Sequence, residues 1–513
     1  MATTVDQPRT GILASVERIG NRLPDPVFIF VWLIAVLVVV SLVASLFGLS
    51  AVNPVTDEEV DAKSLLSGEN LRLLLTNMPV TFTHFHPLGY ALVVMLGAGV
   101  AERSGLLGTA MRLGVRNAPK ALLTPAVVAV GMLSNLAADA AYVVLIPLAG
   151  VLFAAAGRHP IAGIAAAFAA VSGGYAANLF PGQIDALLFG VTEAGAEILV
   201  ADWQANIAGN WYLLAGLFFI YLPVIWYVTD RVLEPRLGPW TGGAVASSDH
   251  PVEGAPTAVE RKALGRAGLS ALILIAIWVF LTIGPGTPLI DEAARPEARF
   301  NPLYQSFVAG FFLLFLIGGW VYGAVAGTIK NHRDLVKMMS EAMADLAYYL
   351  VLAFAAAHFV AMFNWSNLGL ILAIDGAEFL RWTNMPGPAL LGGLVVLTGI
   401  INLFVGSASA KWALLAPILV PMLMLLGISP ETATAAYRVG DSATNIITPL
   451  MVYFPLILIF AQRWDKNFGL GSLTAAMLPY SMWLLITGVA MIVGWVALDL
   501  PLGPGAVVEY VFD

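Results

Sequence analysis

Long apolar segments alternate with short polar ones along the whole chain. An α-helix needs about 20 apolar residues to cross the roughly 30 Å hydrocarbon layer of a membrane. Segments of this length predict nine spans, which in chain order are Val27–Leu49, Pro87–Leu107, Ile161–Val191, Trp211–Val228, Leu269–Gly284, Tyr304–Ala326, Leu346–Phe363, Thr432–Phe460 and Met477–Leu498. The pattern therefore predicts an all-α polytopic membrane protein.

Two further apolar units are each divided into two arms by a polar tip. Leu122–Ala156 has the tip Ser134–Asp139, and Pro388–Leu426 has the tip Gly406–Trp412. Each arm is shorter than the roughly 20 residues that a crossing requires. We therefore expect each unit to be a re-entrant helical hairpin, which enters and leaves the membrane on one side.

The third and eighth spans are interrupted by residues that unwind helices. Gly173–Gly182 brings glycines and a proline into the third span, and Gly440–Asn445 followed by Thr448 and Pro449 interrupts the eighth. Proline removes a backbone donor and glycine weakens a helix interior, so we expect broken helices at both places.

Each half of the chain thus contains a hairpin followed by a broken helix. Aligning Pro147 with Pro417 places Tyr142 on Trp412. Because Lys and Arg favour cytoplasmic loops, their placement opens the first hairpin to the cytoplasm and the second to the periplasm, which makes the halves an inverted repeat. The predicted organisation is 1–26 as a cytoplasmic segment, 27–229 as the first half (hairpin 122–156, broken helix 161–191), 230–267 as a cytoplasmic loop, 268–345 as two scaffold spans, 346–498 as the second repeat (hairpin 388–426, broken helix 432–460) and 499–513 as a periplasmic tail.

Composition supports the membrane class and excludes several functions. The 513 residues are 59% hydrophobic and 11% charged, whereas an average soluble domain is about 25% charged. The absence of cysteine excludes disulfides and thiolate chemistry, and the net charge of −8 argues against a nucleic-acid partner. Without a P-loop, HExxH or GxSxG motif, ATP-driven export and intramembrane hydrolysis have no support. We expect neither an enzyme nor an organic cofactor.

Paired broken segments in inverted halves indicate a transporter with its binding site near the membrane midplane. Broken helices free backbone carbonyls, and the oxygens of Ser, Asn and Asp beside them are hard ligands that suit Na⁺. The candidate ion ligands are Ser134, Asn135, Asp139, Asn178, Asp441 and Asn445. We expect Na⁺ at Asn178, Asn445 or Asp441, while Asp185 and Asp441 leave H⁺ coupling open.

Charged residues at membrane depth cost about 2.5–3.5 kcal/mol each at the centre of a lone helix. Those in or beside the interruptions are Asp139, Asp185, Lys411, Arg438 and Asp441. Arg438 and Asp441 are three residues apart, so we expect them to share a helix face and to pair. Lys411 either pairs with a charge of the substrate or extends out of the hairpin toward water. Asp185 either acts in the site or caps the N–H groups that the broken helix frees. Trp412 either packs against the protein or contacts a ligand.

Five segments between Phe85 and Leu450 carry motifs of a known family, namely Phe85–Gly89, Gly99–Leu106, Phe363–Asn367, Ser407–Trp412 and Gly440–Leu450. They resemble the AbgT family of p-aminobenzoyl-glutamate transporters and antimetabolite exporters. The resemblance implies a homodimer with nine spans and two hairpins per protomer in the bacterial inner membrane. It also implies functional positions at Asp185, Ser409, Trp412, Arg438, Asp441 and Pro449.

The resemblance further implies p-aminobenzoyl-glutamate, p-aminobenzoate and sulfonamides as substrates. An aromatic anion of this kind would find Arg438 or Lys411 for its carboxylates and Trp412 for its ring. A Na⁺-coupled dicarboxylate carrier and a Na⁺/H⁺ exchanger of similar architecture are the alternatives. The first predicts competition by succinate or citrate, and the second predicts pH changes without an organic substrate.

Overall fold

The computed structural model describes residues 25–512, except for residues 55, 117, 138–139, 242–255, 285, 294–298, 449 and 452. Helices dominate this part of the chain. Its two strands, β1 (Ser50–Val52) and β2 (Glu59–Asp61), form a short antiparallel hairpin in which Ser50 pairs with Asp61. The all-α prediction is confirmed, because these strands occupy only a connection between helices.

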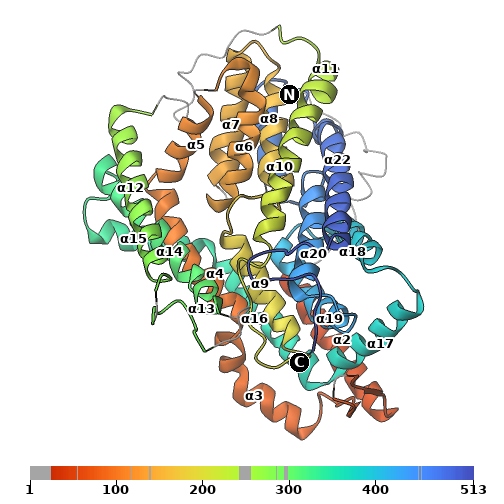
Figure 1. Ribbon diagram of the computed structural model, residues 1–513. Helices are drawn as coiled ribbons and strands as arrows, with labels where there is room; N and C mark the ends of the chain where they lie inside the picture. The colour runs from red at the N-terminus through yellow and green to blue at the C-terminus, as the bar shows by residue number, and fades with distance from the viewer. Residues whose placement is uncertain are drawn as a thin grey trace, which may run out of the picture.

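The first repeat consists of a helical hairpin, a broken helix and a returning helix (Figure 1). Its elements in chain order are η1 (Lys120–Leu122), α6 (Leu123–Leu133), the 3₁₀ turn η2 (Ser134–Ala137), α7 (Ala140–Ala155), α8 (Pro160–Phe168), the π-helical turn η3 (Ala169–Gly173), α9 (Gln183–Ala196) and α10 (Trp211–Tyr227). The chain is unwound at residues 174–182, between η3 and α9. This segment contains the predicted glycines and proline.

The second repeat has the same order of elements. They are α18 (Gly387–Asn402), α19 (Ala408–Met424), α20 (Pro430–Asn445), α21 (Phe454–Gln462) and α22 (Leu470–Ala497), and they follow the helix α17 (Leu368–Trp382). The predicted break at Gly440–Asn445 is wrong in position, because α20 remains helical through Asn445 and ends just after it. The Thr444 hydroxyl finds an acceptor within this helix, since it donates to the Gly440 carbonyl at 3.1 Å.

The remaining helices surround these repeats. They are α2 (Pro26–Leu46), α3 (Gly68–Thr83), α4 (His86–Arg103), α5 (Leu106–Arg116), the π-helical turn η4 (Val228–Leu233), α11 (Glu234–Leu237), α12 (Ala258–Phe280), α13 (Asn301–Gln305), α14 (Phe307–Ala326), α15 (His332–Asp345) and α16 (Ala347–Trp365). α4 packs against α14 and α15 and also against α9. It therefore joins the outer helices to the first repeat, where the Tyr90 hydroxyl donates to Glu193 at 3.0 Å.

Seven helices in the described part of the chain are long and apolar enough to cross a membrane, or eight if α17 and α18, bent by 119°, count as one span. The total of nine spans stays a prediction. The predicted loop 230–267 is partly helical, because η4 and α11 follow α10 directly and α12 begins at Ala258. Thr257 and Glu260 form a capping box that starts α12 early.

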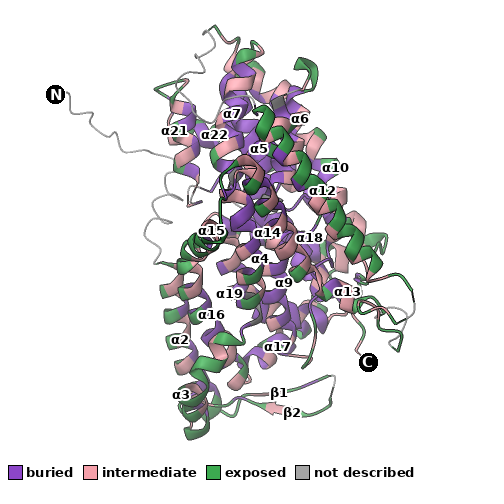
Figure 2. Ribbon diagram, turned by 90° about the vertical axis from the view of Figure 1, so that its left-hand side faces the viewer, coloured by how far each residue is buried: buried purple, intermediate pink, exposed green. Residues whose placement is uncertain are grey.

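Burial follows the repeats rather than the outer helices. Every residue of α8 is buried, and its small Ala and Gly side chains allow neighbouring helices to approach closely. α20 is also almost wholly buried, although it carries an arginine, an aspartate and several hydroxyl groups. Figure 2 shows exposed residues gathered on α2, α3 and α12 instead. Polar groups that are buried in this way need partners from the protein itself.

The C-terminal segment folds back against one end of both repeats. Leu502 accepts backbone hydrogen bonds from Tyr212 and Leu213, at the start of α10. Further along, Val508 accepts from Ser429 at 2.9 Å and Tyr510 donates to Gly427 at 2.8 Å, in the connection between α19 and α20. The segment therefore bridges the two repeats.

Candidate functional site

Asp185 and Arg438 form a buried ion pair between the repeats. Asp185 lies in the first turn of α9, where its Oδ2 accepts from the Gly182 N–H at 2.6 Å. Its Oδ1 accepts from Arg438 Nη1 of α20 at 2.5 Å, and the two side chains are only 3% and 2% exposed. An acidic group in a first turn satisfies free N–H groups and suits the positive end of the helix. Asp185 thus combines the capping role with a charge partner.

Asp441 and Lys411 form a second ion pair, and both side chains are fully buried. Lys411 lies in the first turn of α19, and Asp441 lies in the last turns of α20. The other carboxylate oxygen of Asp441 accepts from the Tyr175 hydroxyl at 2.5 Å. Since Tyr175 belongs to the unwound segment of the first repeat, this pair also lies where the two repeats meet.

Asn402, the last residue of α18, organises the surroundings of Lys411. Its Oδ1 accepts from the Lys411 ammonium. Its Nδ2 faces the Asp441 carbonyl at 2.7 Å, Thr444 Oγ1 at 2.9 Å and Asn445 Oδ1 at 3.1 Å. Asn445, a predicted ion ligand, therefore lies beside the predicted ligand Asp441.

The predicted pairing of Arg438 with Asp441 is wrong. In the described structure Arg438 reaches α9, whereas Asp441 faces α19. Residues three apart on a helix point roughly 60° away from each other, and here each meets an opposite charge from a different helix. As a result α20 is connected to both neighbours by buried ion pairs.

Trp412 is fully buried against α9 and α20. Its ring stacks on Tyr437 with a centroid distance of 4.4 Å and an interplanar angle of 22°. Its indole N–H donates to Thr192 Oγ1 at 2.9 Å, and Thr192 shares a 2.7 Å hydrogen bond with Thr434. In this conformation Trp412 packs the hairpin, so contact with a substrate requires a rearrangement.

Ser409 occupies the partly exposed tip of the second hairpin. Ser407 caps α19 by accepting from the Ala410 N–H at 3.3 Å, and the Ser407 and Ser409 hydroxyls are 3.3 Å apart. The tip therefore presents hydroxyl groups at the N-terminus of a helix, one turn from Lys411.

The unwound segment of the first repeat and the first residue of α9, which follows it, hold two buried oxygens without a hydrogen-bond donor in the described structure. They are Oδ1 of Asn178, a residue only 3% exposed, and Oε1 of Gln183. Buried acceptors are normally satisfied by protein groups or ordered water, so each of these oxygens has room in its hydrogen bonding for a water molecule or a cation. Ser442 of α20 donates to the Gly173 carbonyl at 2.7 Å and ties this segment to the second repeat.

The first hairpin tip keeps its polar groups close to its own backbone. Ser134 donates to the Gly131 carbonyl at 2.6 Å, and Asn135 donates to the Met132 carbonyl at 3.0 Å. Their oxygens remain available as acceptors. Two predicted site residues, Asp139 and Pro449, lie outside the described residues.

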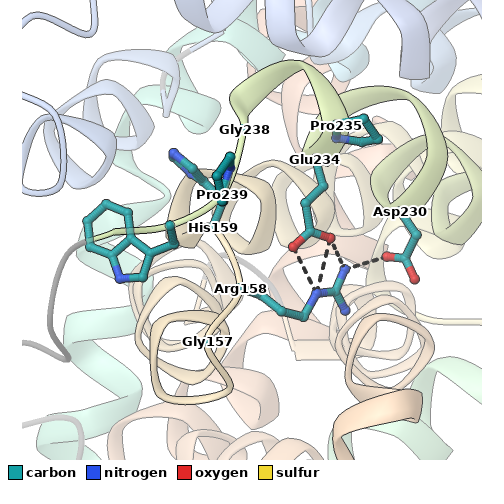
Figure 3. Close-up of a pocket in the computed structure, with 9 residues that line it drawn as sticks. Gly157, Arg158, His159, Asp230, Glu234, Pro235, Gly238 and Pro239 are labelled. Atoms are coloured by element: carbon teal, nitrogen blue, oxygen red, sulfur yellow. Dashed lines mark hydrogen bonds and ion pairs between the residues drawn. The ribbon is translucent and has the colours of Figure 1, made fainter.

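A separate cavity of about 380 Å³ lies away from these pairs, where the turn between α7 and α8 meets α11 (Figure 3). Arg158 there donates to Asp230 at 2.6 Å and also binds Glu234. Burial lowers the pKa of the neighbouring His159, while the carboxylates of Glu234 and Asp465 act in the opposite direction. Because Arg158 is already paired with two carboxylates, it is not free to bind an anion in this cavity.

The AbgT putative transporter family matches residues 11–510 of this sequence. The chain belongs to this family. It is 36% identical to the p-aminobenzoyl-glutamate transport protein of Escherichia coli (strain K12) over 490 residues, which cover 96% of this chain and 95% of the relative. The resemblance predicted from the motifs is confirmed.

Two solved AbgT-like structures share the fold. The YdaH transporter of Alcanivorax borkumensis, described as having an unusual topology, matches with a TM-score of 0.87 and 44% identity over 94% of this chain and all of its own. Neisseria gonorrhoeae MtrF, described as illuminating a class of antimetabolite efflux pumps, matches with a TM-score of 0.89 and 42% identity over 97% of this chain and all of its own. AbgT proteins are transporters, which confirms the prediction that the chain is not an enzyme.

Sequence reasoning missed Asn402, Tyr175 and Gln183. Each is a neutral polar residue in an apolar or unwound segment, and such residues stand out less than charges do. For Asn402 a signal was present, because it is the single amide in a largely apolar arm, four residues before the second tip begins at Gly406.

Proposed function

We propose that this AbgT protein is an ion-coupled secondary transporter of p-aminobenzoyl-glutamate or related aromatic antimetabolites, working by alternating access in the bacterial inner membrane. The observation that carries the proposal is the meeting of the two repeats at two buried ion pairs, Asp185–Arg438 and Lys411–Asp441. The substrates named for the E. coli and N. gonorrhoeae relatives supply the chemical class.

The substrate would bind where basic groups lie beside an aromatic ring. Arg438 and Lys411 can exchange their protein carboxylates for those of the substrate, and Ser409 can add a hydrogen bond at the hairpin tip. Arginine suits carboxylates because its donors form a planar fork. Trp412 would receive the benzoyl ring after leaving Tyr437. The family resemblance also assigns Pro449 to the substrate site.

Na⁺ is the proposed coupling ion. Asn178 and Gln183 offer unsatisfied oxygens in the first repeat, together with the tip residues Ser134, Asn135 and Asp139. Asp441 and Asn445 offer oxygens in the second repeat. Carboxylate and amide oxygens fit a hard cation. The carboxylates of Asp185 and Asp441 would instead carry protons if the coupling ion is H⁺.

The assembly in the membrane is proposed from the family resemblance and the distribution of Lys and Arg. Two chains would form a homodimer, each with its N-terminus in the cytoplasm and its C-terminus in the periplasm. α2 and α12 provide exposed apolar surface for lipid, with only 22% and 11% of their most apolar windows buried.

Uptake of labelled p-aminobenzoyl-glutamate into proteoliposomes tests the proposal. We expect an inward Na⁺ gradient to drive uptake in the wild type but not in Asp441→Asn. Glu341→Gln, at a half-exposed carboxylate of α15, is the control and should transport normally. Uptake driven only by a proton gradient would show that the coupling ion is H⁺ and not Na⁺. Absence of uptake under both gradients, or full competition by succinate, would contradict the proposed substrate.

A further inference from the structure

We propose that the Lys411 ammonium is an internal cation that competes with the coupling cation for Asp441 and Asn402. When the coupling cation binds there, it releases Lys411 to hold a carboxylate of the substrate. This inference rests on the proposed function, and it assigns to one side chain the link between cation binding and anion binding.

Two side-chain oxygens converge on the Lys411 ammonium. They are Oδ1 of Asp441 and Oδ1 of Asn402, and all three groups are buried. The Asn402 amide cannot easily turn over, because its Nδ2 already faces the acceptors Asp441 O, Thr444 Oγ1 and Asn445 Oδ1. Tyr175 holds the second Asp441 oxygen. The two convergent oxygens are therefore fixed in place with or without lysine.

The backbone around these oxygens also favours a cation. Asn402 is the last residue of α18, and Asp441 lies one turn before the end of α20. Helix C-termini carry partial negative charge from unsatisfied carbonyls. Two such ends meet here, with one carboxylate and one amide oxygen between them. This is a site for a single small positive charge, and Lys411 now supplies it.

A second cation cannot share the site with the ammonium. Na⁺ at Asp441 and Asn402 would lie against Lys411, with like charges in contact in a buried environment where repulsion is weakly screened. Binding of Na⁺ at these oxygens and of Lys411 at the same oxygens is therefore mutually exclusive.

The displaced Lys411 ammonium can move to the tip of the second hairpin. Lys411 lies in the first turn of α19, next to the partly exposed tip formed by Ser407 and Ser409. A helix N-terminus attracts anions, and the lysine side chain is long and flexible. The tip and the displaced ammonium together form a carboxylate site that is complete only when the cation has replaced Lys411. Because coupling between binding sites is reciprocal, the substrate must then strengthen cation binding by the same factor.

Binding measurements on purified, detergent-solubilised protein test this. The first is ²²Na⁺ binding without substrate, and the second is binding of labelled p-aminobenzoyl-glutamate with Na⁺ or with choline. In the wild type we expect Na⁺ to raise the affinity for p-aminobenzoyl-glutamate at least tenfold. In Lys411→Met we expect Na⁺ to bind at least fivefold more tightly than in the wild type, because its competitor is gone. In the same variant Na⁺ should change substrate affinity less than twofold.

Lys337→Met is the matched control, since Lys337 is an exposed lysine of α15 that pairs only weakly with Glu341, at 3.8 Å. It should behave as the wild type in both measurements. Lys411→Gln provides a neutral polar variant if the methionine variant is not monodisperse. Unchanged or weaker Na⁺ binding after loss of Lys411, or wild-type Na⁺ dependence of substrate binding, would overturn the inference. Failure of the wild type to bind p-aminobenzoyl-glutamate would instead contradict the proposed substrate, and the ²²Na⁺ comparison would still decide on the competition.

Discussion

Arg438 shows how a single residue links the two repeats of the protein. It lies on α20, is 1% exposed, and reaches Asp185 at the start of α9. A buried pair of this kind adds little net stability, but breaking it leaves an uncompensated charge, which costs about 3–5 kcal/mol. The pair therefore fixes the geometry of the site more than it strengthens the fold.

Replacing Arg438 by Met should lower the free energy of unfolding by about 3–5 kcal/mol, because the buried Asp185 would lose its charge partner. The double variant Arg438→Met with Asp185→Asn should recover most of this stability and still fail to transport. Thermal unfolding in detergent and proteoliposome uptake measure the two effects. If the double variant transported normally, the ion pair would have no role beyond folding.

At this scale the sequence revealed the charged residues and not their partners. Asp185, Lys411, Arg438 and Asp441 could be singled out because a charge at membrane depth is costly. Which carboxylate meets which cation depends on the packing of α9, α19 and α20, and this depends on contacts distant in the sequence. The expected Arg438–Asp441 pair failed for this reason, since spacing along one helix ignores the charges that neighbouring helices bring.

Helix α20 is the element on which the site depends. It packs closely against α18, and Gly440 allows this approach. A Cβ at Gly440 would overlap the Val395 carbonyl and the Thr398 hydroxyl. Since Asp441 follows directly, any displacement of α20 from α18 would also move Asp441 away from Asn402.

Gly440→Ala should therefore destabilise the protein by about 1–3 kcal/mol through overpacking, and should weaken both Na⁺ and substrate binding. Gly393→Ala is the matched control, because Gly393 lies on an exposed face of α18 with open space around its Cα. Thermal unfolding of both variants checks the expectation. Equal unfolding temperatures for the two would show that the close approach of α18 and α20 is unimportant.

The hairpins and broken helices could be predicted from the sequence, because glycine, proline and short apolar arms affect only the helix in which they lie. The position of the second break could not be predicted, since the composition of Gly440–Asn445 is typical of an interruption but the segment remains helical. The Thr444 hydroxyl donates to the Gly440 carbonyl one turn earlier and accepts from Asn402, and the Ser442 hydroxyl donates to the Gly173 carbonyl, so these polar residues pack without unwinding the backbone.

Across the whole molecule, the C-terminal segment is the part that joins both repeats at one end. Leu502 binds the start of α10, and Ser429 and Gly427 before α20 bind Val508 and Tyr510. Asn206 adds a hydrogen bond from its side chain to the Pro504 carbonyl at 2.6 Å. No hydropathy pattern could predict this bridge, because it consists mainly of backbone hydrogen bonds between distant segments.

Removing residues 503–513 should lower the unfolding temperature, because the segment's backbone hydrogen bonds and buried side chains would be lost. Each lost hydrogen bond contributes about 0.5–1.5 kcal/mol. Exchanging only the exposed Val511 for Ser is the control and should have little effect. A truncated protein with unchanged thermal stability would contradict a bridging role for the segment.

The central claim is that cation movement and substrate movement are coupled in this protein. The most direct test asks whether a substrate gradient alone can drive the movement of Na⁺. Proteoliposomes with equal Na⁺ on both sides receive an inward gradient of p-aminobenzoyl-glutamate, and movement of ²²Na⁺ is followed. The account predicts that the substrate gradient drives net ²²Na⁺ movement in the wild type and not in Lys411→Met. Substrate entry without any accompanying movement of ²²Na⁺ would contradict Na⁺ coupling at this site.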